Sequence, residues 1–526
     1  MFSRFQRGSV ENLSIGGVVV KNSLYNLLSK FISTLIGIGL TPFIVSYLGL
    51  ELYGVWCIMF VVLGYIALLD LGIGTSFMKF IAEFKALRDM ELINRVINSC
   101  LVFYSILGVI TIGVTSLLSD RFTSFLSVPM SQKHNVVVSF IGCGIIFAMS
   151  CVFSVFNLTI GGLQRMDVSS KIEIVRTLLQ MIATITFLKM GYGLKGLVGS
   201  YAIASLITGV LAIWNTRNLF PDLKIRLRFF NFKLFRDLGV FGAKNQIASF
   251  SDLMTFQLSK VFAGKFIGLS TAGAYEVGSK IPRQLREAVI LLFQPLLPAT
   301  SEMAVLQNRS KIIRMYFLCT KMLIIGILPI VIFIYFTSKT IIFCWLGLPE
   351  GSAAMTLQVL SLAYFLNLGC RVASVITIGM GRPEILMRYG IISGILNPII
   401  SFFLLMKYHL LGLLLGTGIT LLISNGYFLI AVHKYLKVPL GSFIKKVYSL
   451  PFLISLAFGY LAHLLNKLLL GGGFISSRLG QLGCLMAELI VIMGSVLIIT
   501  TVAHYLDQEE YQMLVRHFPN FIRRPK

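Results

Sequence analysis

Long runs of apolar residues, separated by short polar segments, dominate the chain from end to end. Most runs are about 20 residues long, the length that an α-helix needs to cross the ~30 Å hydrocarbon core of a bilayer. The pattern therefore predicts an all-α polytopic membrane protein with about 14 transmembrane helices. The predicted spans are 22–47, 55–77, 97–118, 135–161, 172–190, 195–215, 237–262, 275–299, 314–336, 353–379, 386–406, 411–432, 449–469 and 480–504.

The composition excludes a soluble globular protein. The 526 residues are 56% hydrophobic and 13% charged, whereas soluble domains carry about 25% charged residues. The net charge is +25, from 46 Lys and Arg residues against 21 Asp and Glu residues. In a soluble chain this excess would suggest nucleic-acid binding. Here no basic segment interleaved with aromatic residues lies outside the apolar runs, so we expect no nucleic-acid partner.

The distribution of basic residues predicts the orientation of the chain. If the N-terminus is cytoplasmic, the loops on its side of the membrane hold 27 Lys and Arg residues, and the opposite loops hold 8. Basic residues accumulate in cytoplasmic loops, so both termini are predicted to be cytoplasmic. Omission of one span would destroy this asymmetry, which therefore also supports the even number of spans.

Three loop motifs occur twice in the same order, displaced by 219, 217 and 216 residues. Six predicted spans separate the two copies of each motif, so the two halves run in the same direction, as in many secondary transporters. The pairs are Gly49-Leu50-x3-Gly54 with Gly268-Leu269-x3-Gly273, Gly162-x-x-Arg165 with Gly379-x-x-Arg382, and Gly196-Leu197 with Gly412-Leu413.

The repeat divides the chain into four predicted parts. These are an N-terminal six-helix bundle at 1–215, a basic cytoplasmic linker at 216–236, a C-terminal six-helix bundle at 237–435, and two additional transmembrane helices with a basic cytoplasmic tail at 436–526. Basic and apolar residues alternate in the linker, which suggests a helix lying along the membrane surface.

Some of these motifs, together with one further segment, resemble the sequences of a known protein family. The stretch from Tyr47 to Trp56, the segment from Leu69 to Gly74 and the run Gly161-Gly162-Leu163-Gln164-Arg165-Met166 together resemble the O-antigen-type flippases of the polysaccharide transporter family. This family belongs to the multidrug/oligosaccharidyl-lipid/polysaccharide exporter superfamily, and the resemblance covers about residues 20–435.

The resemblance implies two bundles around a central cavity, lined mainly by spans one, two, seven and eight. It implies a flippase that moves an undecaprenyl-diphosphate-linked oligosaccharide across the bacterial inner membrane by alternating access, for O-antigen or another surface polysaccharide. The implied partners are the lipid-linked oligosaccharide, membrane lipids, and a polysaccharide polymerase with its chain-length machinery.

Eleven Lys and Arg residues, Arg176 among them, lie within predicted spans. Span eight carries a charged stripe, because Glu276, Lys280, Arg283 and Glu287 follow one another at intervals of four, three and four residues and share a helical face. A charged side chain at the centre of a membrane helix costs about 2.5–3.5 kcal/mol on insertion scales. The stripe therefore favours a water-filled cavity. Neutralisation within the helix, by i,i+4 pairs of opposite charge, is the structural alternative.

Spans one and seven carry polar faces of similar spacing. Lys and Arg side chains can neutralise a diphosphate, and Asn, Ser and Thr side chains can exchange hydrogen bonds with sugar hydroxyls. The basic excess around the predicted cavity thus favours an anionic, sugar-bearing substrate. The predicted substrate-binding residues are Asn26, Lys30, Asn245, Ser249, Asp252, Lys260, Glu276, Lys280, Arg283 and Arg286.

Asp70, in the second predicted span, is a candidate for ion coupling. A carboxylate inside the membrane can bind H⁺ or Na⁺ and couple a gradient to transport. Asp70 could equally pair with Lys30 or Lys79, or cap a helix break at Leu71-Gly72-Ile73-Gly74.

Other classes of protein fit the sequence less well. The chain has no Walker A loop, and its eight Cys and six His residues show no metal-ligand spacing, so we predict no enzyme, no metal and no cofactor. A cation-coupled multidrug exporter of the same fold is the first alternative, and such a pump would favour carboxylates and aromatic residues around its ligand. A membrane glycosyltransferase or polymerase would need a larger extramembrane loop than the ~20-residue loops present.

Overall fold

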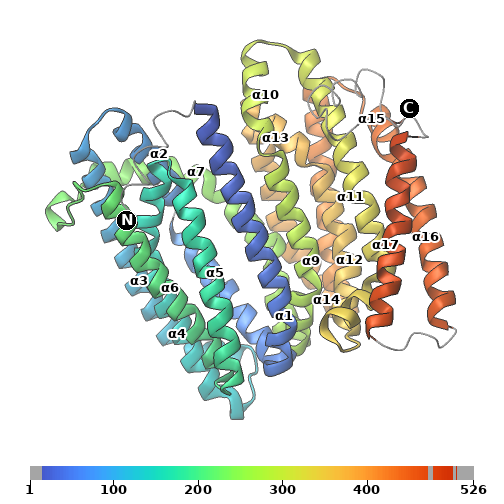
Figure 1. Cartoon of the computed structure of the whole chain (residues 1–526), viewed down its shortest axis with the longest axis horizontal. Coiled ribbons are helices and arrows are strands. Elements are labelled where there is room, and N and C mark those ends of the chain that lie inside the picture. The colour runs from blue at the N-terminus through green and yellow to red at the C-terminus, as the bar shows by residue number, and fades with distance from the viewer. Residues whose placement is uncertain (1–14, 71, 472–477, 502–504, 506–526) are drawn as a thin grey trace, which may run out of the picture. The chain divides into compact units, whose positions relative to one another are not determined.

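The computed structural model describes residues 15–70, 72–471, 478–501 and 505. Within these residues every regular element is a helix (Figure 1). The elements are α1 (Ile15–Ala67), η1 (Leu68–Asp70), α2 (Ile73–Ala86), α3 (Met90–Phe125), α4 (Met130–Gly162), α5 (Met166–Lys189), α6 (Gly193–Leu219), η2 (Leu227–Phe229), α7 (Phe232–Phe256), α8 (Leu258–Phe262), η3 (Ala263–Ile267), α9 (Leu269–Phe293), α10 (Leu296–Val305), α11 (Arg309–Leu346), α12 (Gly351–Gly369), α13 (Arg371–Gly379), α14 (Pro383–Leu436), α15 (Leu440–Ile444), η4 (Lys445–Ser449), α16 (Leu450–Gly471) and α17 (Arg478–Thr501).

The helices confirm a polytopic membrane protein. Among the described residues, eight helices are long and apolar enough to cross a bilayer, and a ninth results if α9 and α10, which meet at a bend of 42°, form one span. Helices α1 and α14 each contain a break, at Gly49 (φ 73°, ψ 167°) and at His409 (φ 50°, ψ −129°). Each of these two long helices therefore covers two of the predicted spans. The total of 14 spans remains a prediction.

The chain forms two compact units. The first comprises Met1–Leu253 and Lys260–Gly273, and the second comprises Met254–Ser259 and Ala274–Lys526. In the first unit, α4 packs on α3 and α6, and α5 packs on α6 and α1. In the second unit, α11 packs on α12 and α17, α12 packs on α14, and α16 lies beside α17 (Figure 1).

The first repeated motif is the site of a close backbone contact within the first unit. A Cβ atom added to Gly54 would lie 2.2 Å from the carbonyl oxygen of Leu269, and one added to Gly273 would lie 2.1 Å from the carbonyl oxygen of Leu50. No side chain fits at such distances, so glycine alone lets the two backbones approach. Each copy of the motif thus contacts the other in the same way, which supports the duplication inferred from the sequence.

The second repeated motif shows the same kind of equivalence, once in each unit. A Cβ atom on Gly162, at the end of α4, would lie 2.7 Å from the Cβ atom of Ile81 on α2. A Cβ atom on Gly379, at the end of α13, would lie 2.7 Å from the Cβ atom of Thr300 on α10. Both glycines lie at the end of a helix. Each packs against the short helix at the end of the second predicted span of its own half.

The basic segment after α6 is not the surface helix predicted from its sequence. Its backbone is irregular apart from the single turn η2. Pro221 and the alternation of basic and apolar residues with a period of two both oppose a helix. The segment is instead held in an extended form by two asparagine side chains of α3.

Asn94 and Asn98 bind this segment in the same manner. The Oδ1 atom of Asn94 accepts from Lys224 N at 2.7 Å, and its Nδ2 atom donates to Asp222 O at 3.0 Å. The Oδ1 atom of Asn98 accepts from Arg226 N at 2.8 Å, and its Nδ2 atom donates to Lys224 O at 2.7 Å. Four residues of helix rise about 6 Å and two residues of extended chain about 6.6 Å, so the two spacings match.

Candidate functional site

Two places concentrate polar and charged groups in the described structure: the charged face of α9 in the second unit, and a cavity among the helices of the first unit. On α9, Arg283 forms an ion pair with Glu276, seven residues earlier. The guanidinium Nη1 atom lies 3.4 Å from Oε2 of Glu276, and the second nitrogen, Nη2, bonds Oε1. Arginine side chains on helices lean toward the N-terminus, which lets Arg283 span two turns.

The ion pair of α9 lies largely inside the protein. Glu276 is 6% exposed, and the side chain of Arg283 is 23% exposed. A buried carboxylate has lost its hydration, so Arg283 provides a compensation that water does not. Removal of Arg283 would therefore take this compensation away from Glu276.

Arg286 is held by a different set of neighbours in the same unit. Its guanidinium carbon lies 4.2 Å from the centre of the Phe256 ring, a cation–π contact. Its Nε atom donates to Oδ1 of Asn367 at 3.2 Å, and its Nη1 atom lies 3.8 Å from Oε1 of Glu287. Three kinds of interaction thus fix its orientation.

The other predicted binding residues have varied surroundings. Asn26, Lys30, Ser249 and Asp252 are exposed, Lys280 is half-buried, and Lys260 is only 4% exposed. The side chain of Asn245 lies outside the described residues. Of the ten residues, the structure brings Glu276 and Arg283 into direct contact, and Asn26 lines the cavity described below. A common binding site for all ten remains a prediction.

Asp70 ends the short turn η1 between α1 and α2. Its Oδ1 atom accepts a hydrogen bond of 2.6 Å from the hydroxyl of Tyr104 on α3, and the carboxylate also accepts from the backbone at Gly74. The bond to the first turn of α2 agrees with the helix-capping role considered for Asp70. Its role in ion coupling is still a prediction.

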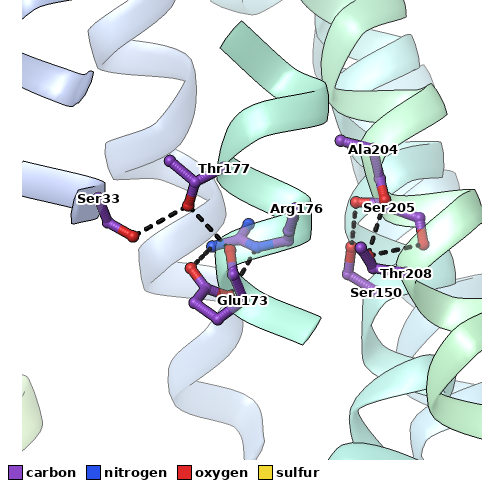
Figure 2. Close-up of polar contacts among 8 residues, drawn as sticks. All are labelled: Ser33, Ser150, Glu173, Arg176, Thr177, Ala204, Ser205 and Thr208. Atoms are coloured by element: carbon purple, nitrogen blue, oxygen red, sulfur yellow. Dashed lines mark hydrogen bonds and ion pairs between the residues drawn. The ribbon is translucent and has the colours of Figure 1, made fainter. Parts of the chain in front are cut away.

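A cavity of about 550 Å³ lies inside the first unit, among α1, α2, α4, α5 and α6. Arg176 and Glu173 of α5 line it and form a bidentate pair, with Nη2–Oε1 at 2.5 Å and Nε–Oε2 at 2.8 Å (Figure 2). Their side chains are 41% and 38% exposed, so the pair remains accessible. The next residue, Thr177, shares a hydrogen bond of 2.9 Å with Ser33 of α1, which ties α5 to α1.

Hydroxyl and amide groups form the rest of the polar lining. Ser150 of α4 and Ser205 of α6 lie 3.3 Å apart between their Oγ atoms, close to Thr208 (Figure 2). Two polar atoms of lining residues, Oδ1 of Asn157 and Oγ of Ser169, are buried without a hydrogen-bond partner in the described part of the chain. Buried polar atoms are usually paired, so these two point to a ligand or water.

A second cavity of about 280 Å³ shares Ser150, Arg176 and Ser205 with the first and is otherwise mostly apolar. Its aromatic residues are Trp56, Phe60, Phe147 and Tyr201. The ring centre of Trp56 lies 4.8 Å from that of Phe60 and 5.2 Å from that of Tyr201. A polar compartment and an aromatic compartment thus meet at Arg176.

The sequence analysis did not single out this double cavity as a site. One signal for it was present, since Arg176 is among the basic residues of the predicted spans. A second was the polar face of α4, where Ser150, Ser154 and Asn157 follow at intervals of four and three residues. A charged residue opposite such a face, in helices of the same bundle, predicts a polar interior.

These helices define a multi-pass membrane protein with polar groups in its interior. The family model described as polysaccharide biosynthesis protein matches residues 19–304. The chain belongs to this polysaccharide biosynthesis family.

The chain is also similar to two relatives from bacteria. A Shigella flexneri protein assigned the role of O-antigen transporter is 20% identical over 417 residues, 77% of this chain and 96% of that protein. EpsK, an uncharacterized membrane protein of Bacillus subtilis (strain 168), is 22% identical over 279 residues, which is 52% of this chain and about half of EpsK (55%).

Two solved structures share the fold. The lipid II flippase MurJ in an inward closed conformation has a TM-score of 0.71 at 12% identity, covering 94% of this chain and 100% of MurJ. A multidrug resistance MATE family transporter in an inward-facing conformation has a TM-score of 0.68 at 16% identity, covering 79% of this chain and 99% of that chain.

Proposed function

We propose that the chain is a flippase that moves an undecaprenyl-diphosphate-linked oligosaccharide across the bacterial inner membrane by alternating access, with both termini in the cytoplasm. The product would serve the synthesis of O-antigen or another surface polysaccharide. The family match and the O-antigen transporter relative support this class of substrate.

The observation that carries the proposal is the Arg283–Glu276 pair in α9. A charged pair inside an apolar bundle is rarely retained for stability alone, because well-packed apolar residues are often as stable. A diphosphate offers Arg283 a second anionic partner, because two oxygens of a phosphate can accept the same pair of parallel N–H bonds as a carboxylate. We therefore propose that Arg283 exchanges Glu276 for the diphosphate during transport, with Lys280 as a further positive charge.

The remaining predicted residues complete this proposal. Asn26, Lys30, Asn245, Ser249, Asp252, Lys260 and Arg286 are proposed as further substrate contacts, and Asp70 as the site that couples an ion gradient. A polysaccharide polymerase and its chain-length machinery are the proposed consumers of the product, because a translocated unit must next be joined to others.

Deletion of the gene, followed by analysis of lipid-linked intermediates, tests the proposed function. We expect undecaprenyl-diphosphate oligosaccharide to accumulate on the cytoplasmic face and surface polymer to be lost, with recovery from a plasmid copy. Unchanged lipid intermediates with increased sensitivity to cationic dyes would favour a multidrug exporter. Single units on the outer face, without polymer, would favour a polymerase.

A further inference from the structure

We propose that the double cavity of the first unit is a recognition subsite for one neutral sugar of the transported headgroup, a hexose or N-acetylhexosamine. This inference rests on the proposed function, since it names the part of the substrate that this site takes. It assigns the sugar to the helices α1, α2, α4, α5 and α6 of the first unit.

The size of the cavity favours a sugar over an ion. The polar compartment measures about 550 Å³ and the aromatic compartment about 280 Å³. Sites for small organic ligands measure about 300–1,000 Å³, whereas a bound metal ion needs only a shell of ligands about 2–2.6 Å away. A single pyranose ring with its substituents fits the polar compartment and can extend into the aromatic one.

The charge of the lining favours a neutral ligand. Among the residues that line the two compartments, Glu173 and Arg176 are the pair that is charged at neutral pH, and their charges cancel. A diphosphate or a sugar acid would meet the carboxylate of Glu173 with a like charge, and a cationic drug would meet Arg176. Two like charges in direct contact repel each other, which weakens binding. A neutral sugar meets neither penalty.

The hydrogen-bonding groups complement vicinal hydroxyls. Glu173 engages Nε and Nη2 of Arg176, and a guanidinium has five N–H donors in all. The carboxylate oxygens each keep a lone pair for a hydroxyl donor. Adjacent sugar hydroxyls both donate and accept, so one sugar edge can bond both members of the pair at once. The unpartnered Oδ1 of Asn157 and the hydroxyl of Ser205 extend this set.

The aromatic compartment supplies an apolar surface for the opposite side of the ring. The C–H groups of a pyranose face are apolar, and large aromatic side chains bury such surface effectively. Trp56 is the aromatic residue best placed to report on the site, because it lines this compartment beside Arg176.

A purely structural role of the Glu173–Arg176 pair is the alternative to a sugar subsite. An i,i+3 pair of opposite charge stabilises a helix by a few tenths of a kcal/mol whether or not a ligand binds. On this account Glu173 and Arg176 support α5, and the cavity holds water. If the cavity is a sugar subsite, a bound sugar changes the surroundings of Trp56. If the pair only supports α5, a sugar leaves them unchanged.

A fluorescence titration of the full-length chain in lipid nanodiscs tests the proposal. The chain has three Trp residues, so replacement of Trp214 and Trp345 by Phe leaves Trp56 as the reporter. The probes are methyl glucoside, methyl N-acetylglucosaminide, methyl glucuronide, inorganic pyrophosphate and tetraphenylphosphonium. We expect a saturable change in emission with at least one neutral glycoside, and about tenfold weaker binding of the other three probes.

Variants of the cavity make the assignment specific. We expect Arg176→Gln and Thr208→Val to abolish or weaken the neutral-glycoside response by about tenfold or more. Thr208→Val keeps the shape of its side chain, so it covers the case in which Arg176→Gln does not fold. The matched control is Arg95→Gln, which removes the arginine of the exposed Arg95–Glu91 pair of α3 and should leave the titration unchanged.

Several outcomes would overturn the subsite. These are no saturable response to any neutral glycoside, a response unchanged in both cavity variants, or tighter binding of pyrophosphate or tetraphenylphosphonium than of the glycosides. If the titration fails while gene deletion still causes lipid intermediates to accumulate, the subsite is wrong and the flippase stands. If glycosides bind while the intermediates do not accumulate, the proposed function is wrong.

Discussion

Gly54 and Gly273 face each other across a backbone contact in which neither can carry a side chain. A Cβ atom on Gly54 would lie 2.8 Å from the backbone nitrogen of Gly273. The two glycines occupy the same position in the two copies of one motif, 219 residues apart. The repeat found in the sequence is thus also a physical contact, and its two halves constrain each other.

Substitution of either glycine is expected to destabilise the protein. Gly54→Ala or Gly273→Ala forces two backbones apart, and overpacking of this kind costs about 1–3 kcal/mol. We expect a lower melting temperature in detergent and lower abundance in the membrane. The control is Gly37→Ala in α1, where an added Cβ meets no atom within 4 Å. Equal melting temperatures for all three variants would contradict the contact.

Variants of Arg283 and Glu276 can distinguish an effect on protein stability from an effect on transport. Arg283→Gln removes one partner of a buried ion pair from Glu276, and such a loss costs about 3–5 kcal/mol, so abundance should fall. The double variant Arg283→Gln with Glu276→Gln removes both charges and should restore abundance. If Arg283 binds the diphosphate, transport stays lost in the double variant, and Arg283→Lys, which keeps the charge but loses the planar fork, is intermediate.

Surface polymer and protein abundance, measured side by side, check this expectation. The exposed Arg382–Glu384 pair provides a control in which the same double replacement by Gln should change neither quantity. Normal polymer in the Arg283 and Glu276 double variant would remove Arg283 from the substrate site and leave the pair a structural role.

The asparagine contacts of the linker predict a change in protease sensitivity. Asn98→Ala removes the side-chain partner of Arg226 N and Lys224 O, at a cost of about 0.5–1.5 kcal/mol per hydrogen bond. Trypsin should then cut after Lys224 or Arg226 faster than in the unmodified chain. Asn215 bonds only a carbonyl of its own helix, Leu211 O, among the described contacts, so Asn215→Ala should not change the rate. Equal cutting in both variants would contradict the role of Asn98.

The role of Asp70 in ion coupling can be tested with variants that affect its two hydrogen bonds differently. Asp70→Asn preserves an acceptor for Tyr104 and for the backbone at Gly74 but cannot carry a charge or exchange a proton. If Asp70 couples an ion gradient, this variant should lose transport at normal abundance, and Tyr104→Phe should retain most of it. Full polymer synthesis by Asp70→Asn would restrict Asp70 to capping α2.

The orientation of the chain is open to reporter fusions. Fusions at Phe2, Arg228 and Lys526 should report the cytoplasm, and fusions at Lys133 and Leu348 the opposite side, because basic residues concentrate on the first side. Phe2 and Lys526 lie outside the described residues. A non-cytoplasmic signal at Lys526, with a cytoplasmic signal at Phe2, would mean that the number of spans is odd.

The pattern of apolar residues predicted the helices. It did not predict which side chains that are distant in the sequence contact each other. The apolar runs and the glycine motifs indicated the membrane class and the duplication, because each run and each copy of a motif is a short stretch of sequence. The linker was mistaken for a helix, since its true partners, Asn94 and Asn98, lie about 130 residues earlier. Arg283 also forms an ion pair with Glu276, seven residues earlier, a spacing that the sequence analysis did not consider. The cavity around Arg176 needs five helices at once, which no single stretch of sequence specifies.

The two asparagines of α3 also bear on biogenesis. Asn98 leaves the ribosome 126 residues before Lys224, an interval on the order of ten seconds at common rates of synthesis. During that time the amides of Asn94 and Asn98 can bond only to carbonyls of their own helix, those of Met90 and Asn94. The emerging segment then docks with Asp222 O and Lys224 N on the amide of Asn94, and with Lys224 O and Arg226 N on the amide of Asn98. Docking of the linker thus marks the maturation of the first bundle while most of the second half is still untranslated.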